Sequence, residues 1–178
     1  TSAHAAINPD KGRSALDALL LTFQGMEFLR EHVREDTRMH YTVSNTYGIP
    51  ANVIPEKVKG SFILRSYNTY ILEDVFKRFQ NIVHGAEMMT DTKAEITIQS
   101  QMAGKIPVMR LNQLLMECAA EVGAPRISEP RKKPGSTDLA NVMQLVPGSC
   151  IRVAFVPPNA ASHSQEFLDN GKAETGHQ

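Results

Sequence analysis

The sequence predicts an α+β fold, and three observations lead to that prediction. Two stretches repeat apolar side chains at the three- and four-residue spacing of an amphipathic helix. Four other stretches contain few turn residues and read as extended strands. Their order over residues 1–105 is strand, helix, strand, strand, helix, strand. This is the ferredoxin-like βαββαβ order, which predicts a four-stranded antiparallel sheet with both helices on one face.

The first half of this pattern begins with a short extended stretch over residues 2–7, followed by a turn over residues 8–12. Apolar spacing then predicts a helix from about Ala15 to Arg34, with Ser14 as its N-cap. Gly25 lies inside that helix, where glycine costs about 1 kcal/mol relative to alanine. We therefore expect Gly25 to mark close packing against another element.

The second half contains two strands, a helix and a last strand. The strands are predicted at Met39–Ser44 and Val58–Arg65, and the helix runs from about Thr69 to about Met89. Residues 94–100 alternate cleanly between apolar and polar side chains, which predicts a fourth strand with one face in water. The pattern ends near residue 105.

Residues 106–178 have a different character. They predict a short helix that stops at Gly123, a charged loop over residues 126–134, a glycine turn over 135–138 and an apolar strand over 151–156. These elements are too few to close a core, so we expect an incomplete α/β segment. The chain also starts without methionine, as though it were cut from a longer protein.

Composition narrows the class of protein. The 178 residues carry 19 basic and 19 acidic side chains, so there is no charge pattern for binding nucleic acid or an anionic membrane. Two cysteines are too few for a disulfide framework. No apolar run reaches the length of a membrane span, and no signal peptide opens the chain. These features suggest a soluble cytoplasmic protein.

A few side chains could carry chemistry. Asn52 lies between two prolines in an extended loop, and Arg65 ends a strand, where its planar fork could bind a carboxylate. A loop asparagine and a solvated arginine are the plain alternative. His4 and His163 stand among small polar residues that leave the imidazole accessible. The metal-binding spacings HxxxH, CxxC and HExxH are absent, so no self-contained metal site is predicted.

Several of these residues lie in segments that together resemble a known family. The first segments are residues 2–6, 12–18, 29–32 and 50–55 together with Arg65. They resemble the lid domain of the dinuclear-metal amidohydrolases, which include aminoacylases and carboxypeptidase-type enzymes, and within them the branch that contains the B subunit of aminobenzoyl-glutamate hydrolase. Residues 135–138 and 162–164, with Pro147 and Phe167, resemble the C-terminal part of the catalytic domain.

The resemblance implies a role for each candidate residue. His4 matches a lid histidine that reaches the neighbouring subunit's active site and stabilises the oxyanion. Asn52 matches the lid asparagine at the substrate, and Arg65 matches the arginine that grips the substrate carboxylate. Gly135 falls in the glycine loop beside the substrate, and His163 matches the last metal ligand.

The implied protein is a metal-dependent amidohydrolase or peptidase. It would hydrolyse an amide bond of an N-acyl or aminobenzoyl amino acid, or of a small peptide, with two divalent zinc or manganese ions. Residues 1–105 would form the lid and dimerisation domain of a homodimer, and residues 106–178 the C-terminal part of the catalytic domain. The family's other metal ligands and its general-base glutamate precede the lid and are absent here. We therefore expect this chain alone to bind metal poorly and to be inactive.

Two other classes stay open on the sequence. A ferredoxin-like domain can be an amino-acid-binding module, or a purely structural dimerisation module without a site. An RNA-binding sheet is disfavoured because the predicted strands lack paired stacking aromatics and there is no basic face.

Overall fold

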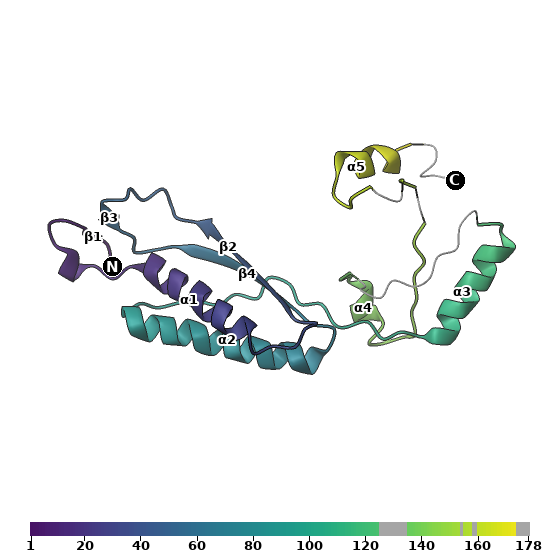
Figure 1. The fold of residues 1–178 in the computed structure, drawn as a ribbon, viewed down its shortest axis with the longest axis horizontal. Coiled ribbons are helices and arrows are strands. Elements are labelled where there is room, and N and C mark those ends of the chain that lie inside the picture. Colours follow the sequence, from purple (N-terminus) through teal and green to yellow (C-terminus); the bar gives the residue numbers. More distant parts are fainter. Residues whose placement is uncertain (125–134, 154, 158–159, 174–178) are drawn as a thin grey trace. The chain divides into compact units, whose positions relative to one another are not determined.

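The computed structural model describes residues 1–124, 135–153, 155–157 and 160–173 (Figure 1). They fall into two compact units. The first comprises Thr1–Lys105 with Ser136–Gln144, and the second Ile106–Gly135 with Leu145–Gln178. The charged loop predicted over residues 126–134 lies outside the described residues.

Both predicted helices of the first unit are present. α1 (Ala15–Arg30) begins as predicted at Ser14, whose hydroxyl accepts the backbone N–H of Asp17 at 3.1 Å. It ends four residues before the predicted Arg34. α2 (Thr69–Thr90) is capped by the Asn68 side chain and ends at Asp91, which adopts a left-handed backbone with φ of 51°. In the part of the chain that the structure describes, no helix has the length and hydropathy to cross a bilayer.

The sheet differs from the prediction. β2 (Arg38–Asn45) and β4 (Lys59–Arg65) form one antiparallel ribbon, and β1 (Ala3–His4) pairs with β3 (Val53–Ile54) in a second one. The expected four-stranded sheet is therefore wrong: the strands form two separate two-stranded ladders.

The first predicted strand is shortened and the fourth is missing, for different reasons. The first strand stops at His4 because its carbonyl accepts the N–H groups of Ile7 and Asn8, at 3.2 and 3.1 Å, which turns the chain away. A short 3₁₀ helix, η1 (Pro9–Lys11), follows. Residues 94–100 form no ladder, and Ile96 and Ile98 are 40 % and 58 % exposed. Alternation determines which side chains share a face, but it does not supply a neighbouring strand.

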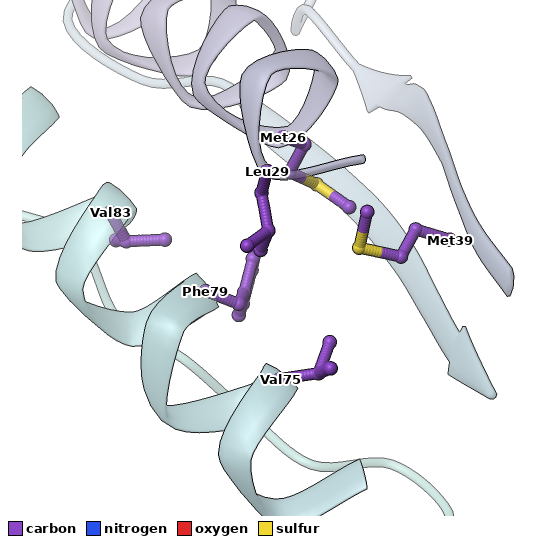
Figure 2. Packing of buried hydrophobic residues seen from close by; sticks show 6 residues of the cluster. All are labelled: Met26, Leu29, Met39, Val75, Phe79 and Val83. Atoms are coloured by element: carbon purple, nitrogen blue, oxygen red, sulfur yellow. The ribbon is translucent and has the colours of Figure 1, made fainter. Parts of the chain in front are cut away.

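The core of the first unit lies between the two helices and one face of the β2–β4 ribbon (Figure 2). Its buried side chains come from all three parts: Met26, Leu29, Met39, Val75, Phe79 and Val83. At Gly25 an added Cβ would lie 2.5 Å from Cγ2 of Ile82 in α2. The predicted close packing at this glycine is therefore confirmed.

The remaining elements are helices. α4 (Leu139–Val142) belongs to the first unit, while α3 (Met109–Glu121) and α5 (Gln165–Gly171) belong to the second. The strand expected over residues 151–156 is absent from its described residues, where Val153 is 73 % exposed. No parallel or antiparallel neighbour lies among the described residues of this unit to satisfy a strand's backbone. The expected α/β character of this segment is therefore not found in its described residues.

Candidate functional site

The structure brings His4 and Asn52 together at one end of the first unit. β1 and β3 pair so that His4 stands opposite Val53, and the Ala5 N–H donates to the Asn52 carbonyl at 2.9 Å. The Val53 N–H closes the turn before β3 by donating to the Pro50 carbonyl at 3.1 Å. Both side chains are exposed. The backbones of two residues far apart in sequence thus lie next to each other, and each carries an exposed side chain.

A local hydrogen bond sets the tautomer of His4. The backbone N–H of Ala6 donates to Nδ1 of His4 at 3.2 Å. Because a backbone N–H can only donate, Nδ1 is the acceptor and the neutral ring carries its proton on Nε2. The imidazole therefore presents an N–H donor at Nε2.

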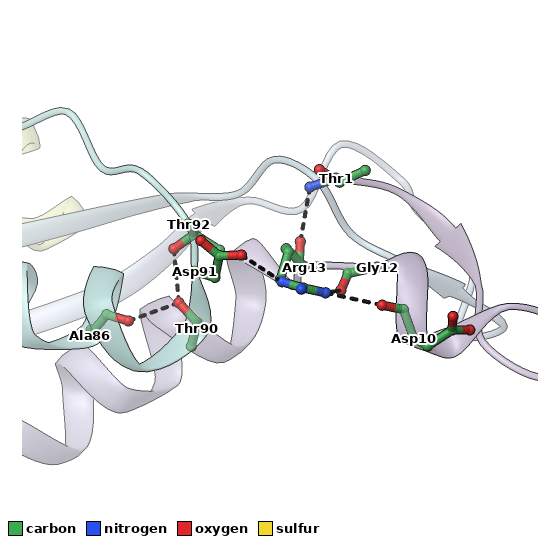
Figure 3. Close-up of polar contacts among 8 residues, drawn as sticks. All are labelled: Thr1, Asp10, Gly12, Arg13, Ala86, Thr90, Asp91 and Thr92. Carbon is green, nitrogen blue, oxygen red and sulfur yellow. Dashed lines mark hydrogen bonds and ion pairs between the residues drawn. The ribbon is translucent and has the colours of Figure 1, made fainter.

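Arg13 holds the loop that carries this histidine (Figure 3). No residue of the first 13 is buried, so polar contacts must position the loop. The Arg13 backbone exchanges hydrogen bonds with Thr1 at 2.9 and 3.1 Å. Its guanidinium binds the Asp91 carboxylate at 2.9 Å and the carbonyls of Asp10 and Gly12 at 3.1 and 2.7 Å. The loop is thereby tied to the end of α2.

Arg65 lies elsewhere, at the end of β4. It is exposed and stands opposite Arg38 of β2. Arg38 donates through Nη1 to the carbonyls of Thr37, at 2.7 Å, and of Glu35. In the ion pairs found among the described residues, neither arginine takes part. No local pattern in the sequence marks Arg38, because only the register of the ribbon places it beside Arg65.

His4 and Arg65 are separated by about the length of β4. The β3 segment is tied to the start of α1, since the Ala15 N–H donates to the Pro55 carbonyl at 2.8 Å. Arg65 is opposite Arg38 in the ladder. Met39, the residue after Arg38, accepts a hydrogen bond at its carbonyl from Arg30 at the end of α1. The 16 residues of α1 span about 24 Å and the seven of β4 about 20 Å. The structure therefore does not bring these two candidates into one cluster.

Gly135 and His163 belong to the second unit. Gly135 is exposed, and among the described residues the Arg152 guanidinium, at 3.9 Å, is the nearest group to a Cβ added there. His163 precedes Ser164, the N-cap of α5, and has a left-handed φ of 69°. That conformation is uncommon outside glycine and gathers at functional sites.

A complete metal centre is not formed by the described residues. No group of three or more His, Cys, Asp or Glu side chains that could hold a metal ion occurs among them. A catalytic zinc site needs at least three protein ligands. The donors present in the described part of the chain therefore do not fit the dinuclear site that the resemblance implies.

Among the described residues, the largest pKa shift belongs to a structural ion pair. Arg30 binds both carboxylate oxygens of Glu27 at 2.7 and 2.9 Å, and its hydrogen bond, with a second from the Tyr41 hydroxyl, lowers the pKa of Glu27 to about 2. Arg30 also donates to the Met39 carbonyl at 2.9 Å. These contacts fasten α1 to β2, so the shift marks a packing contact and not a reactive carboxylate.

Comparison with known proteins adds to this geometry. Residues 1–87 match the family model of the peptidase dimerisation domain. The chain is 32 % identical over 124 residues to the B subunit of p-aminobenzoyl-glutamate hydrolase from Escherichia coli, covering 70 % of this chain and 26 % of that protein. It is 26 % identical over 172 residues to mouse (Mus musculus) Xaa-Arg dipeptidase, covering 94 % of this chain and 39 % of that protein.

A solved structure is similar as well. The aminobenzoyl-glutamate utilization protein from Klebsiella pneumoniae matches 81 % of this chain and 37 % of its own, with a TM-score of 0.62 and 25 % identity. The chain thus spans about a quarter to two fifths of the length of these relatives. The resemblance found in the sequence is confirmed, and residues 1–87 of this chain belong to the peptidase dimerisation domain family.

Proposed function

We propose that this chain is the lid, with the C-terminal part of the catalytic domain, of a metal-dependent amidohydrolase or peptidase. Residues 1–105 act as the lid and dimerisation domain, and residues 106–178 contribute to the catalytic domain. The substrate is an N-acyl or aminobenzoyl amino acid or a small peptide. Similarity to hydrolases named for aminobenzoyl-glutamate and for dipeptides supports this class of substrate.

The observation that carries the proposal is the preset donor of His4. An amide attacked by water develops negative charge on its carbonyl oxygen, and a preorganised N–H donor stabilises that charge. The Ala6 N–H keeps the proton of the neutral His4 ring on Nε2. Asn52, held beside it through the β1–β3 pairing, offers a side-chain amide that can donate or accept toward the same substrate.

Arg65 takes the second role, as the bidentate partner of the substrate carboxylate. In an N-acyl amino acid this carboxylate is only a few bonds from the amide that is cleaved. His4 and Arg65 of one chain are far too distant to contact the same molecule, because the length of β4, about 20 Å, lies between them. One site therefore takes His4 and Asn52 from one protomer and Arg65 from its partner, which makes a homodimer necessary.

The proposed enzyme takes two divalent ions, zinc or manganese, and His163 is the one ligand that we assign. The left-handed backbone at His163 supports this assignment, because strain of this kind persists where a ligand site requires it. The described residues do not complete the ligand set. We therefore assign no catalytic step to the metal. Gly135 is proposed to line the substrate side of the same centre.

Single variants of the complete enzyme test the two lid roles. Changing His4→Ala removes a donor used in the transition state, so kcat should fall by about a hundredfold or more. The change Arg65→Lys replaces a planar fork with a point charge, so KM should rise while kcat changes little. A His4 variant that raises KM alone would contradict the oxyanion role.

Mixed dimers test how the roles divide between the two protomers. A heterodimer of a His4→Ala chain and an Arg65→Ala chain contains one site with both groups intact, and it should recover about half the wild-type activity. A heterodimer of His4→Ala with Asn52→Ala is the matched control. It should stay inactive, because those two residues act from the same protomer. Verified His4/Arg65 heterodimers without activity would refute the proposed arrangement.

A further inference from the structure

Two arginines face each other on the outer side of the β2–β4 ribbon. Arg38 and Arg65 are directly paired in the ladder, and both are exposed. The neighbouring pair, Met39 and Leu64, packs toward the helices, so alternation places the arginines on the opposite face. Directly opposed side chains have Cβ atoms about 5 Å apart.

The opposed positions of Arg38 and Arg65 lower the stability of the fold unless an anion lies near both charges. Like charges directly opposite each other across a ladder repel. The nearby Asp36 carboxylate lies 3.6 Å from Arg34, and Glu35 contributes its backbone carbonyl, through a bond to Nη1 of Arg38. No ion pair found among the described residues neutralises either ladder arginine.

Two backbone carbonyls hold one side of the Arg38 guanidinium. Its Nη1 is held by the carbonyls of Glu35 and Thr37. The opposite edge of the planar fork, formed by Nε and Nη2, retains the paired N–H groups that match a carboxylate. Fixing one edge in advance lowers the entropy cost of binding at the other.

We propose that Arg38 is a specificity-determining residue that binds a second carboxylate, on the side chain of the same amino acid whose α-carboxylate Arg65 binds. This inference rests on the proposed role of Arg65. The substrate class it names is an N-acyl amino acid with an acidic side chain. The same pair of cations disfavours a basic side chain at that position.

The test compares two substrates of nearly equal shape, an N-acyl glutamate and the matching N-acyl glutamine, with the complete enzyme. In the Arg38→Gln variant, kcat/KM for the glutamate substrate should fall about tenfold or more, mainly through KM, because a charged hydrogen-bond partner is lost. The value for the glutamine substrate should stay within about twofold, since that substrate makes no ion pair with Arg38. The control Lys59→Gln removes an exposed cation from the other end of β4. It should leave the ratio of kcat/KM for the glutamate substrate to kcat/KM for the glutamine substrate unchanged.

The outcomes separate this inference from the proposed function. An equal loss for both substrates, or an unchanged ratio in Arg38→Gln, would mean that Arg38 only stabilises its turn and would overturn the inference. If Arg65→Lys also left KM unchanged for both substrates, the proposed function itself would fail.

Discussion

Replacing Gly25 of α1 with alanine sets two opposing effects against each other. Alanine in a helix interior is favoured over glycine by about 1 kcal/mol. The new Cβ, however, would lie 2.5 Å from Cγ2 and 3.4 Å from Cγ1 of Ile82. Because a β-branched side chain in a helix has one strongly preferred rotamer, Ile82 cannot turn away. Overpacking costs about 1–3 kcal/mol, and the upper part of that range applies here.

We therefore expect Gly25→Ala to lower the free energy of unfolding by about 1–2 kcal/mol. Urea denaturation followed by circular dichroism measures this change. Gly85→Ala in α2 is the matched control, because in the described part of the chain no atom beyond its chain neighbours and the adjacent helix backbone lies within 4 Å of its added Cβ. That variant should be more stable than wild type by up to about 1 kcal/mol.

A second variant isolates the contact itself. In an Ile82→Ala background the opposing methyl groups are gone, so Gly25→Ala should become neutral or stabilising. The cycle of the four proteins gives the interaction free energy of the pair. If Gly25→Ala stabilises the wild-type chain as much as Gly85→Ala does, α1 and α2 are not closely packed at Gly25 and Ile82, and the prediction is refuted.

Three further predictions concern the ion pair of Glu27, the contacts of Arg13 and metal binding. The pKa of Glu27 lies at about 2, below its ordinary 4.5. Its ion pair therefore adds stability above about pH 4.5 that is lost as the pH falls toward 2. In denaturation curves Glu27→Gln should make the free energy of unfolding depend less on pH in this range, and an unchanged pH dependence would contradict the prediction. Arg13→Ala should speed amide exchange in residues 1–13 while α1 and α2 stay protected, and Asp91→Asn should do so to a smaller extent because the carbonyl contacts remain. Calorimetric titration of this chain with zinc or manganese should show weak binding, and an assay of the same chain should show no amidase activity. Tight stoichiometric binding would disprove the expectation that His163 lacks enough further metal ligands in this chain.

The sequence determined the elements whose stabilising contacts are local. The spacing of apolar side chains indicated α1 and α2. The cap at Ser14 depends on a hydrogen bond to a residue only three positions further along the chain. The same spacing could not show how the strands pair. Residues 94–100 alternate well but pair with no strand among the described residues, because pairing depends on an edge supplied by distant residues.

For the candidate site, the sequence supplied residue types and the family they resemble, while the tertiary structure determined which of them meet. His4 and Asn52 come together only through the β1–β3 ladder, and Arg65 lies about 20 Å along β4 from that end. The pairing of Arg38 with Arg65, and of Arg13 with Asp91 across 78 positions, leaves no local pattern in the sequence. Such contacts arise from strand register and helix packing, which are set by the whole domain and not by neighbouring residues.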